Sequence, residues 1–214
     1  MKLCVIGGAG ARSAFLTKSL VKSARDIRVD HIVLLDNDQQ KLKTYGEISR
    51  ELARRLDPDL TFEVTSDARA ALTGVDYIIT TIRAGEDAGR LFDEQTCLAH
   101  GVLGQETTGA GGFAMAIRSV PTLVYYCTLA REVANPGHLI FNFTNPSGII
   151  TQALRSKGFD NVYGICDAPS GFIKQLEEIL EIPYGTLDIE CYGLNHLSWF
   201  RNAKVNGRDV QREL

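Results

Sequence analysis

A thiol and an imidazole stand in two short motifs of the C-terminal third of the sequence. Cys166 follows the apolar run VYGI, and His196 lies in the motif GLNH. A thiolate and a neutral imidazole can bind a divalent transition metal and leave coordination positions open for substrate oxygens. An unpaired cysteine is more often an inert core residue. Asp167, directly after Cys166, and the GLNH motif favour the metal site, although spacing alone does not bring the two side chains together.

Three further polar residues belong to motifs that follow predicted strands. Arg90 ends the segment 83–90, Glu106 lies in GQETTG, and Asn145 lies in TNPSG. Each also has an ordinary interpretation: Arg90 as a surface arginine, Glu106 as a solvated carboxylate and Asn145 as a turn residue. Open α/β sheets bind ligands at the carboxyl ends of their strands, so the convergence of these motifs on one edge predicts a ligand site there.

A glycine-rich segment, GAGARS, follows the first predicted strand and opens the first predicted helix. Gly8 and Gly10 would let the backbone approach a pyrophosphate at the helix N-terminus, and Ser13 would pack closely and cap the helix. Asp36 ends the second strand, where its carboxylate can accept hydrogen bonds from a ribose and repel a 2′-phosphate. With Thr81 near the end of the fourth expected strand, this pattern predicts NAD binding; an ordinary tight turn and a solvated aspartate are the alternatives.

The elements that position these residues alternate between strands and helices. The expected strands are KLCVI, HIVLLD, TFEVT, DYIITTI, HLIFNF and VYGIC, and the expected helices span residues 13–23, 39–56, 67–72, 114–133, 148–157 and 170–180. This alternation predicts an α/β fold with a Rossmann-like, doubly wound parallel sheet. Pro121 is expected to kink or restart the helix 114–133.

The pattern changes near Pro183, where LDIECYG and LSWFRNAKV favour strands. We therefore expect an NAD-binding domain over residues 1–168. Residues 169–214 are expected to begin a more β-rich α+β domain that binds substrate and metal and is truncated at residue 214.

Composition excludes several classes of partner. The 214 residues carry a formal net charge of −3 and no long block of Lys and Arg, so nucleic acid is not an expected partner. No run of 18 consecutive apolar residues and no secretory h-region occur, which predicts a cytoplasmic protein without a membrane span. Five scattered cysteines without a C-x-x-C pair favour reduced thiols.

The order and spacing of longer motifs resemble glycoside hydrolase family four, whose members are NAD- and metal-dependent. The motifs are RAGEDAGRLFDEQTCLAHGVLGQETTGAGGFAMAIR, FNFTNPSG, ICDAP and GLNHLSWF, and the resemblance extends to about residue 200. It implies that Cys166 and His196 hold the catalytic metal, usually manganese. It also implies that Asp167 is the acid that protonates the leaving oxygen.

The same resemblance assigns roles to the other polar residues. Arg90 and Asn145 would grip a phosphosugar, and Glu106 would tune a catalytic tyrosine. The glycine segment departs from the family, because Ala11-Arg12-Ser13-Ala14 replaces the usual Ser-, Thr-, Tyr- or Pro-rich continuation. This departure affects details of the cofactor contact rather than the fold.

The implied reaction is hydrolysis by an unusual route, since cleavage through an oxocarbenium-like state needs no nicotinamide. NAD⁺ would oxidise C3 of the sugar, the C2 proton would become acidic, the C1 substituent would be eliminated, and water and the stored hydride would be added back. In family members, a tyrosine beyond the metal histidine removes the C2 proton. We expect this base beyond residue 214, and therefore little glycosidase activity from this chain without a complementary chain.

Cys166-Asp167-Ala168-Pro169 is similar to the 6-phosphoglucosidases of the family, and the surrounding motifs are closer to the β-specific branch. We expect a 6-phospho-β-glucosidase of carbohydrate metabolism that acts on a phosphorylated disaccharide or aryl phosphoglucoside and is a homo-oligomer at full length. The first alternative is a 6-phospho-α-glucosidase. Another is a lactate- or malate-type hydroxy-acid dehydrogenase, because Thr144-Asn145-Pro146 is similar to the substrate loop of those enzymes. The last is a truncated nucleotide-binding protein without activity.

Overall fold

A computed structural model describes all 214 residues of the chain. Its larger sheet has six parallel strands in the order β3-β2-β1-β4-β5-β6. These strands are β1 (Lys2–Ile6), β2 (His31–Leu35), β3 (Thr61–Thr65), β4 (Tyr77–Thr80), β5 (Leu139–Asn142) and β6 (Val162–Gly164). The crossover from β3 to β4 reverses the strand order beside β1, as in Rossmann-like sheets, so the predicted fold class is confirmed.

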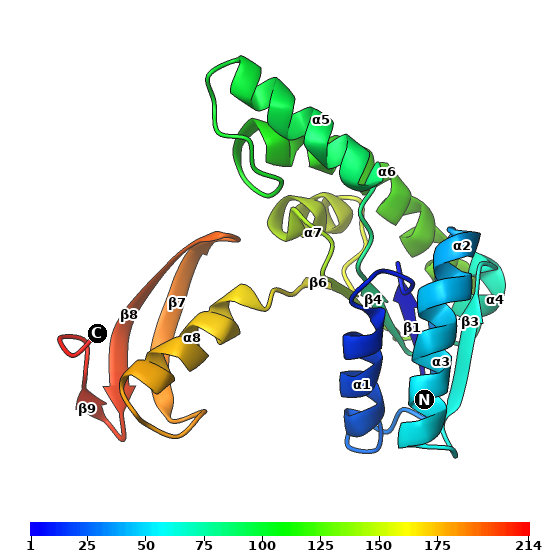
Figure 1. Cartoon of the computed structure of the whole chain (residues 1–214), viewed down its shortest axis with the longest axis horizontal. Helices are drawn as coiled ribbons and strands as arrows, with labels where there is room; N and C mark the ends of the chain where they lie inside the picture. Colours follow the sequence, from blue (N-terminus) through cyan, green and yellow to red (C-terminus); the bar gives the residue numbers. More distant parts are fainter.

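Helices cover both faces of this sheet (Figure 1). They are α1 (Ser13–Ser23), α2 (Gln39–Lys41), the π-helical segment η1 (Leu42–Gly46), α3 (Glu47–Leu56), α4 (Ala68–Leu72), α5 (Glu86–Ala99), α6 (Gly109–Val133), α7 (Ser147–Ser156) and α8 (Ala168–Ile179). Alternate residues of β1 face opposite cores. Cys4 and Ile6 pack in the cluster with α4, α6 and α7, whereas Leu3 and Val5 pack in the cluster with α1 and α3.

Helix α6 is longer than its sequence predicts. It begins at Gly109 and continues as one helix through Pro121, so the expected restart at Pro121 is wrong, whereas a kink there stays a prediction. Packing against α4, α5 and α7 outweighs the hydrogen bond that proline cannot donate. By length and composition α6 could also cross a membrane, but Leu123, Cys127 and Ala130 on its inner side belong to the main core. A helix packed in the core of a protein can be as long and as apolar as a helix that crosses a membrane.

Helix α5 is not among the expected helices, and the motif 83–90 is expected only to follow a strand at the ligand-binding edge of the sheet. The helix begins at Glu86, after Gly85 adopts a left-handed conformation with φ +84°. It packs on α6, and the two helices project beyond the sheet as a hairpin (Figure 1). Its exposed apolar residues, including Leu91, Phe92 and Leu98, blur the one-sided pattern by which a surface helix is recognised. Arg90 therefore lies on a helix rather than in a loop.

The C-terminal part is β-rich, as predicted. Strand β7 (Leu187–Leu194) pairs antiparallel with β8 (Leu197–Val205), and the short β9 (Arg208–Asp209) completes a second sheet. With α8, this sheet encloses a separate small core of Leu176, Leu187, Ala203 and Val210. The exact boundary between the two domains stays a prediction.

Candidate functional site

The glycine loop is hydrogen-bonded to the end of β2 and passes close to the segment that follows β4. The backbone N–H groups of Gly7 and Gly8 donate to the Leu35 carbonyl at 2.9 and 3.0 Å. A Cβ on Gly7 would lie 2.7 Å from the Thr81 carbonyl oxygen, and φ of Gly7 is +84°. Gly7 is therefore the glycine that allows this close approach, and the Gly7-Gly8 doublet is its signal in the sequence.

The predicted cofactor residues border this loop. The N–H of Ala9 donates to Asp36 Oδ2 at 3.1 Å, which holds the loop against the end of β2. A Cβ on Gly10 would meet nothing within 4 Å, so the backbone is open to an approaching ligand there. Together these features form a cradle at the N-terminus of α1 that fits the pyrophosphate of a dinucleotide.

Ser13 does not cap α1 as expected. It is the first residue of the helix, and its hydroxyl donates to the Gly10 carbonyl at 2.6 Å, while Arg12 occupies the N-cap position without a capping side chain. The side chain of Ser13 is buried, so its predicted close packing is present. The first turn of α1 thus keeps N–H groups that no side chain caps.

The structure brings Cys166 and His196 together, although 30 residues separate them in sequence. Cys166 follows β6, and His196 lies in the tight turn between β7 and β8 with φ +60°. The Cys166 Sγ and His196 Nε2 atoms are 3.5 Å apart. Metal–sulfur and metal–nitrogen bonds of about 2.3 and 2.0 Å place two ligand atoms about 3.1–3.6 Å apart, so this pair fits a shared metal ion.

This pair is an incomplete ligand set. No third His, Cys, Asp or Glu completes the group, and Asp167, the residue after Cys166, is the N-cap of α8. Two protein ligands would leave the remaining positions to water or to substrate oxygens, which is typical of catalytic rather than structural metal sites.

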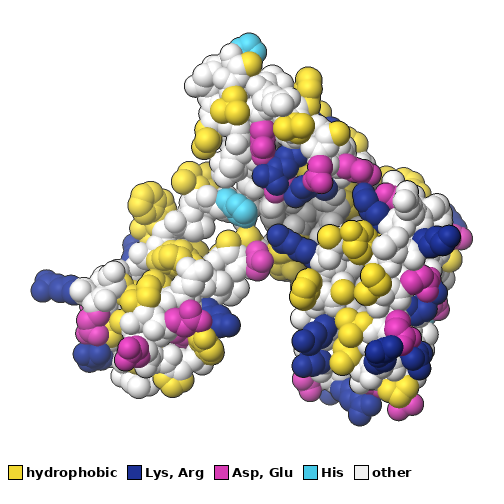
Figure 2. All heavy atoms as spheres, in the orientation of Figure 1, with side chains coloured by type: hydrophobic (Ala, Val, Ile, Leu, Met, Phe, Trp, Pro, Cys, Tyr) yellow, Lys and Arg dark blue, Asp and Glu magenta, His cyan; other side chains and the backbone are white.

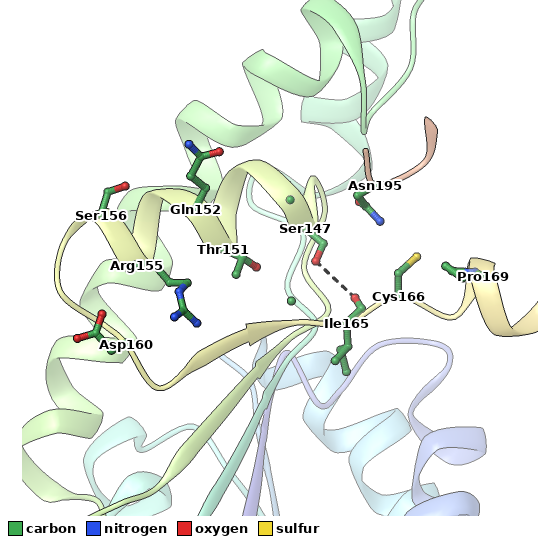
Figure 3. A pocket seen from close by; sticks show the side chains of 12 residues that line it. Ser147, Thr151, Gln152, Arg155, Ser156, Asp160, Ile165, Cys166, Pro169 and Asn195 are labelled. Carbon is green, nitrogen blue, oxygen red and sulfur yellow. Dashed lines mark hydrogen bonds between the residues drawn. The ribbon is translucent and has the colours of Figure 1, made fainter. Parts of the chain in front are cut away.

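A groove of about 840 Å³ lies beside Cys166 along α7. Figure 3 shows Cys166 and Asn195 pointing towards each other at its end, while Arg155 and Thr151 line its length. The Oδ1 atom of Asn195 is buried without a hydrogen-bond partner. Sequence reasoning missed Asn195, although its position before His196 in GLNH was a signal. Asn145 lies in the loop that leads into α7, the helix that lines this groove.

A second polar cluster surrounds Glu106. Its Oε2 atom lies 3.4 Å from Arg83 Nη2 and 3.9 Å from Arg90 Nε. Arg90 Nε also donates to Glu94 at 2.7 Å, and this hydrogen bond, with the charge of Glu106, raises the pKa of Arg90. Arg83 is a member of this cluster that sequence reasoning missed; it stands where β4 turns towards α5.

The two clusters are separate: the Glu106 cluster lies between β4 and α6, and the Cys166–His196 pair lies between the end of β6 and the β7–β8 turn. Figure 2 shows a hollow bordered by a histidine and by a group of acidic and basic side chains. No hydrogen bond or ion pair links Glu106 and its arginines to Cys166 or His196. A ligand that reached both would have to span this hollow.

Comparison with known proteins gives a consistent result. Residues 2–182 match the model of the family described as family 4 glycosyl hydrolase. A 6-phospho-β-glucosidase of Thermotoga maritima is 35% identical over 216 residues, which cover 100% of this chain and 51% of the relative. The chain spans about half the length of the curated relatives it matches.

Comparison with solved structures gives the same result as comparison of sequences. A 6-phospho-α-glucosidase from gut microorganisms, in complex with NAD and Mn²⁺, has a TM-score of 0.93 and 31% identity, over 99% of this chain and 49% of that one. The Thermotoga maritima 6-phospho-β-glucosidase with manganese, NAD⁺ and glucose-6-phosphate has a TM-score of 0.90 and 34% identity, over 100% and 51%. A malate dehydrogenase of Salinibacter ruber, at 17% identity and a TM-score of 0.70, shares the fold alone.

Proposed function

This chain belongs to the family 4 glycosyl hydrolases. We propose that it takes part in the NAD- and metal-dependent hydrolysis of the O-glycosidic bonds of 6-phospho-β-glucosides. The observation that carries the proposal is the 3.5 Å approach of Cys166 Sγ to His196 Nε2 on a chain whose sheet also ends in a dinucleotide cradle. A glycosidase that used only two carboxylates would need neither feature.

The cofactor part of the proposal is supported by the glycine loop. Gly8 and Gly10 would receive the pyrophosphate at the N-terminus of α1, and Asp36 would face the adenosine ribose. Thr81, whose carbonyl lies beneath Gly7, would border the cofactor at the end of β4. NAD, when bound, would supply an acceptor for a sugar hydride and return it, so no net oxidation results.

The metal part rests on the thiol–imidazole pair. Cys166 and His196 would hold a divalent metal, and Mn²⁺ is the ion in the related structures. Such an ion would polarise sugar oxygens in its open positions. Asp167 would deliver a proton to the leaving oxygen from the start of α8.

The substrate part rests on charge and position. The guanidinium of Arg90 presents paired donors that match phosphate oxygens, and Asn145 would bind the sugar from the edge of the groove. Glu106 would hold Arg83 and Arg90 in place and adjust the charge around the reacting sugar. The proposal also includes a cytoplasmic homo-oligomer without nucleic-acid or membrane partners.

Two other activities compete with this proposal. Relatives with α-linked substrates are 33% identical or less, so a 6-phospho-α-glucosidase is the nearer alternative. A hydroxy-acid dehydrogenase is disfavoured, because the likeness to malate dehydrogenase extends only to the fold and gives Cys166 and His196 no task.

The test uses aryl 6-phospho-β- and 6-phospho-α-glucosides, with NAD⁺ and Mn²⁺ each added or omitted. Binding of both NAD⁺ and Mn²⁺ to the chain is measured first by calorimetry. We expect both to bind, and any cleavage to require both, to favour the β-anomer and to accumulate no NADH. Faster cleavage of the α-anomer would mean that the substrates are 6-phospho-α-glucosides rather than 6-phospho-β-glucosides. NADH formation from a 2-hydroxy acid, or failure to bind either cofactor, would refute the proposal.

A further inference from the structure

A buried polar network joins the carboxyl ends of β4, β5 and β6. Its members are Thr80, Asn142, Thr144 and Ser147, and each is at most 4% exposed. Polar side chains in such a place are unusual, since apolar residues of the same shape would pack between strands without needing partners. The network therefore calls for an explanation beyond core stability.

Asn142 is the centre of this network, and its amide is satisfied on both sides. Its Oδ1 atom accepts a hydrogen bond from Thr80 Oγ1 at 2.8 Å. Its Nδ2 atom lies 3.3 Å from the Thr144 carbonyl, 3.4 Å from the Ser147 carbonyl and 3.2 Å from Thr151 Oγ1. Two amide hydrogens are thus shared among three acceptors, which fixes the plane of the amide.

The same residue also holds the segment that leads to the metal pair. The Asn142 carbonyl accepts hydrogen bonds from the N–H of Ile165 at 2.9 Å and from Ser147 Oγ at 3.2 Å. Ser147 Oγ also lies 3.4 Å from the Ile165 carbonyl, the contact drawn in Figure 3. Ile165 immediately precedes Cys166, so these bonds orient the backbone from which the thiol projects.

The other branches of the network reach the remaining strand ends. Thr144 Oγ1 accepts a hydrogen bond from the N–H of Ile82 at 3.1 Å and lies 3.4 Å from Thr80 Oγ1. Each branch ends beside a residue already assigned to the site: Thr80 precedes Thr81, and Thr144 precedes Asn145. One buried amide consequently joins the cofactor edge, the sugar-binding loop and the metal-binding loop.

We infer that Asn142 is a positioning residue that sets the geometry of Cys166 and Asn145 for metal and sugar binding, and that Thr80 holds its amide in the working orientation. The inference rests on the proposed function for the identity of the ligands. Groups that orient a metal ligand change metal affinity about 10- to 100-fold when removed. A network that served only stability would lower the melting temperature without changing metal affinity.

The test compares two substitutions of Thr80. Thr80→Val keeps the shape of the side chain but removes the hydroxyl, which leaves Asn142 Oδ1 without its partner. Thr80→Ser keeps the hydroxyl. We expect Mn²⁺ affinity, measured by calorimetry on the whole chain, to fall about tenfold in Thr80→Val and to stay within about twofold in Thr80→Ser. Hydrogen exchange at the Ile165 amide should rise in Thr80→Val alone.

A matched control lies at the opposite edge of the same sheet. Asn135 Nδ2 donates to the Gly74 carbonyl at 3.0 Å and to Asp76 Oδ1 at 2.8 Å. Asn142→Ala and Asn135→Ala should both lower the melting temperature, but only Asn142→Ala should weaken Mn²⁺ binding and speed exchange at Ile165.

The outcomes separate the inference from the proposed function. If the wild-type chain binds Mn²⁺ and the Thr80→Val and Asn142→Ala variants bind it equally well, the inference is wrong and the proposed function stands. If the wild-type chain does not bind Mn²⁺, the proposed metal site is wrong. In that case unchanged exchange at Ile165 in Thr80→Val would refute the positioning role as well.

Discussion

The five cysteines of this chain differ in chemistry because they differ in burial. Burial raises the pKa of Cys4 to about 12, despite the opposing charge of Lys2, and raises the pKa of Cys127 to about 12. Cys191 is exposed and Cys166 is half-buried. Cys97 is also buried. Only thiolates are good nucleophiles and metal ligands, so Cys4 and Cys127 should be inert at neutral pH.

Alkylation should reveal this difference directly. At pH 8 a thiol with a pKa near 12 is ionised to roughly one part in ten thousand, so iodoacetamide should modify Cys166 and Cys191 and spare Cys4 and Cys127. Added Mn²⁺ should protect Cys166 and leave Cys191 reactive. Mass spectrometry of the digested protein measures both effects. Modification of Cys4 in the folded protein would contradict the assigned burial.

Replacement of either proposed metal ligand should abolish most metal binding. Cys166→Ala and His196→Ala each remove one of only two protein ligands, so Mn²⁺ affinity measured by calorimetry should fall by at least about tenfold. Cys191→Ala, on the adjacent strand β7, is the matched control and should leave the affinity unchanged. Retained affinity in both ligand variants would place the metal elsewhere.

Asp36 should determine the choice between NAD and NADP. Asp36→Asn keeps an oxygen that can accept the Ala9 N–H, but it removes the charge that repels a 2′-phosphate. The ratio of NADP to NAD affinity, measured by fluorescence titration, should rise by roughly fivefold or more. Asp38→Asn removes a charge two residues away, where the carboxylate caps α2, and should change this ratio little. Equal shifts in the two variants would mean that only overall charge matters.

At the scale of elements, helix α5 depends on one ion pair between a buried aspartate and a partly exposed arginine. The guanidinium of Arg118, on α6, donates to both carboxylate oxygens of Asp93, which is 7% exposed, and to the Ala84 carbonyl at 3.2 Å. A Cβ on Gly85 would lie only 2.9 Å from Arg118 Nε. The glycine and the arginine together hold the segment that carries Arg83 and Arg90.

This pair should contribute far more stability than the ion pairs on the surface. Arg118→Leu leaves Asp93 buried without its partner, so the free energy of unfolding should fall by about 2–4 kcal/mol. Arg54→Leu breaks the solvent-exposed pair with Glu51, and it should lower the free energy of unfolding far less. Urea denaturation followed by circular dichroism compares the two. Similar losses would show that Asp93 is not buried against Arg118.

At the scale of the whole molecule, the two sheets differ greatly in their cores. The larger sheet is covered by clusters of 17 and 8 buried residues, whereas the small sheet rests on a cluster of 4. The link that concerns function is the contact between Cys166, at the end of β6, and His196, in the β7–β8 turn. A metal bound there would join the two parts of the molecule.

Hydrogen exchange should detect this coupling. Amides in the hairpin 187–205 should exchange faster than those in β1 and β4, because a small core resists local opening less. Mn²⁺ should slow exchange in the hairpin and leave β1 unchanged, since binding stabilises the closed form. The His196→Ala variant should lose this protection. Uniform protection across both sheets would instead indicate a global effect of the metal.

Much of the fold could be predicted from local patterns. The strands of the larger sheet and the β-rich ending follow from short apolar and β-branched runs, and the glycine loop follows from its place between a strand and a helix. The motifs around Arg90, Glu106, Asn145 and Cys166 were sufficient to indicate the family. These features are local, because each depends on residues within a few positions of one another.

The tertiary structure alone decided how segments distant in sequence meet. Helix α5, the unbroken course of α6 through Pro121, and the contact of Arg83 with Glu106 depend on packing partners that no local pattern contains. The 3.5 Å approach of Cys166 to His196 likewise requires the β7–β8 turn to fold back on the end of β6. Residue types and spacing specify which groups are available for chemistry. Only the burial and hydrogen bonding of the folded chain, as around Asn142, determine the distances at which they act.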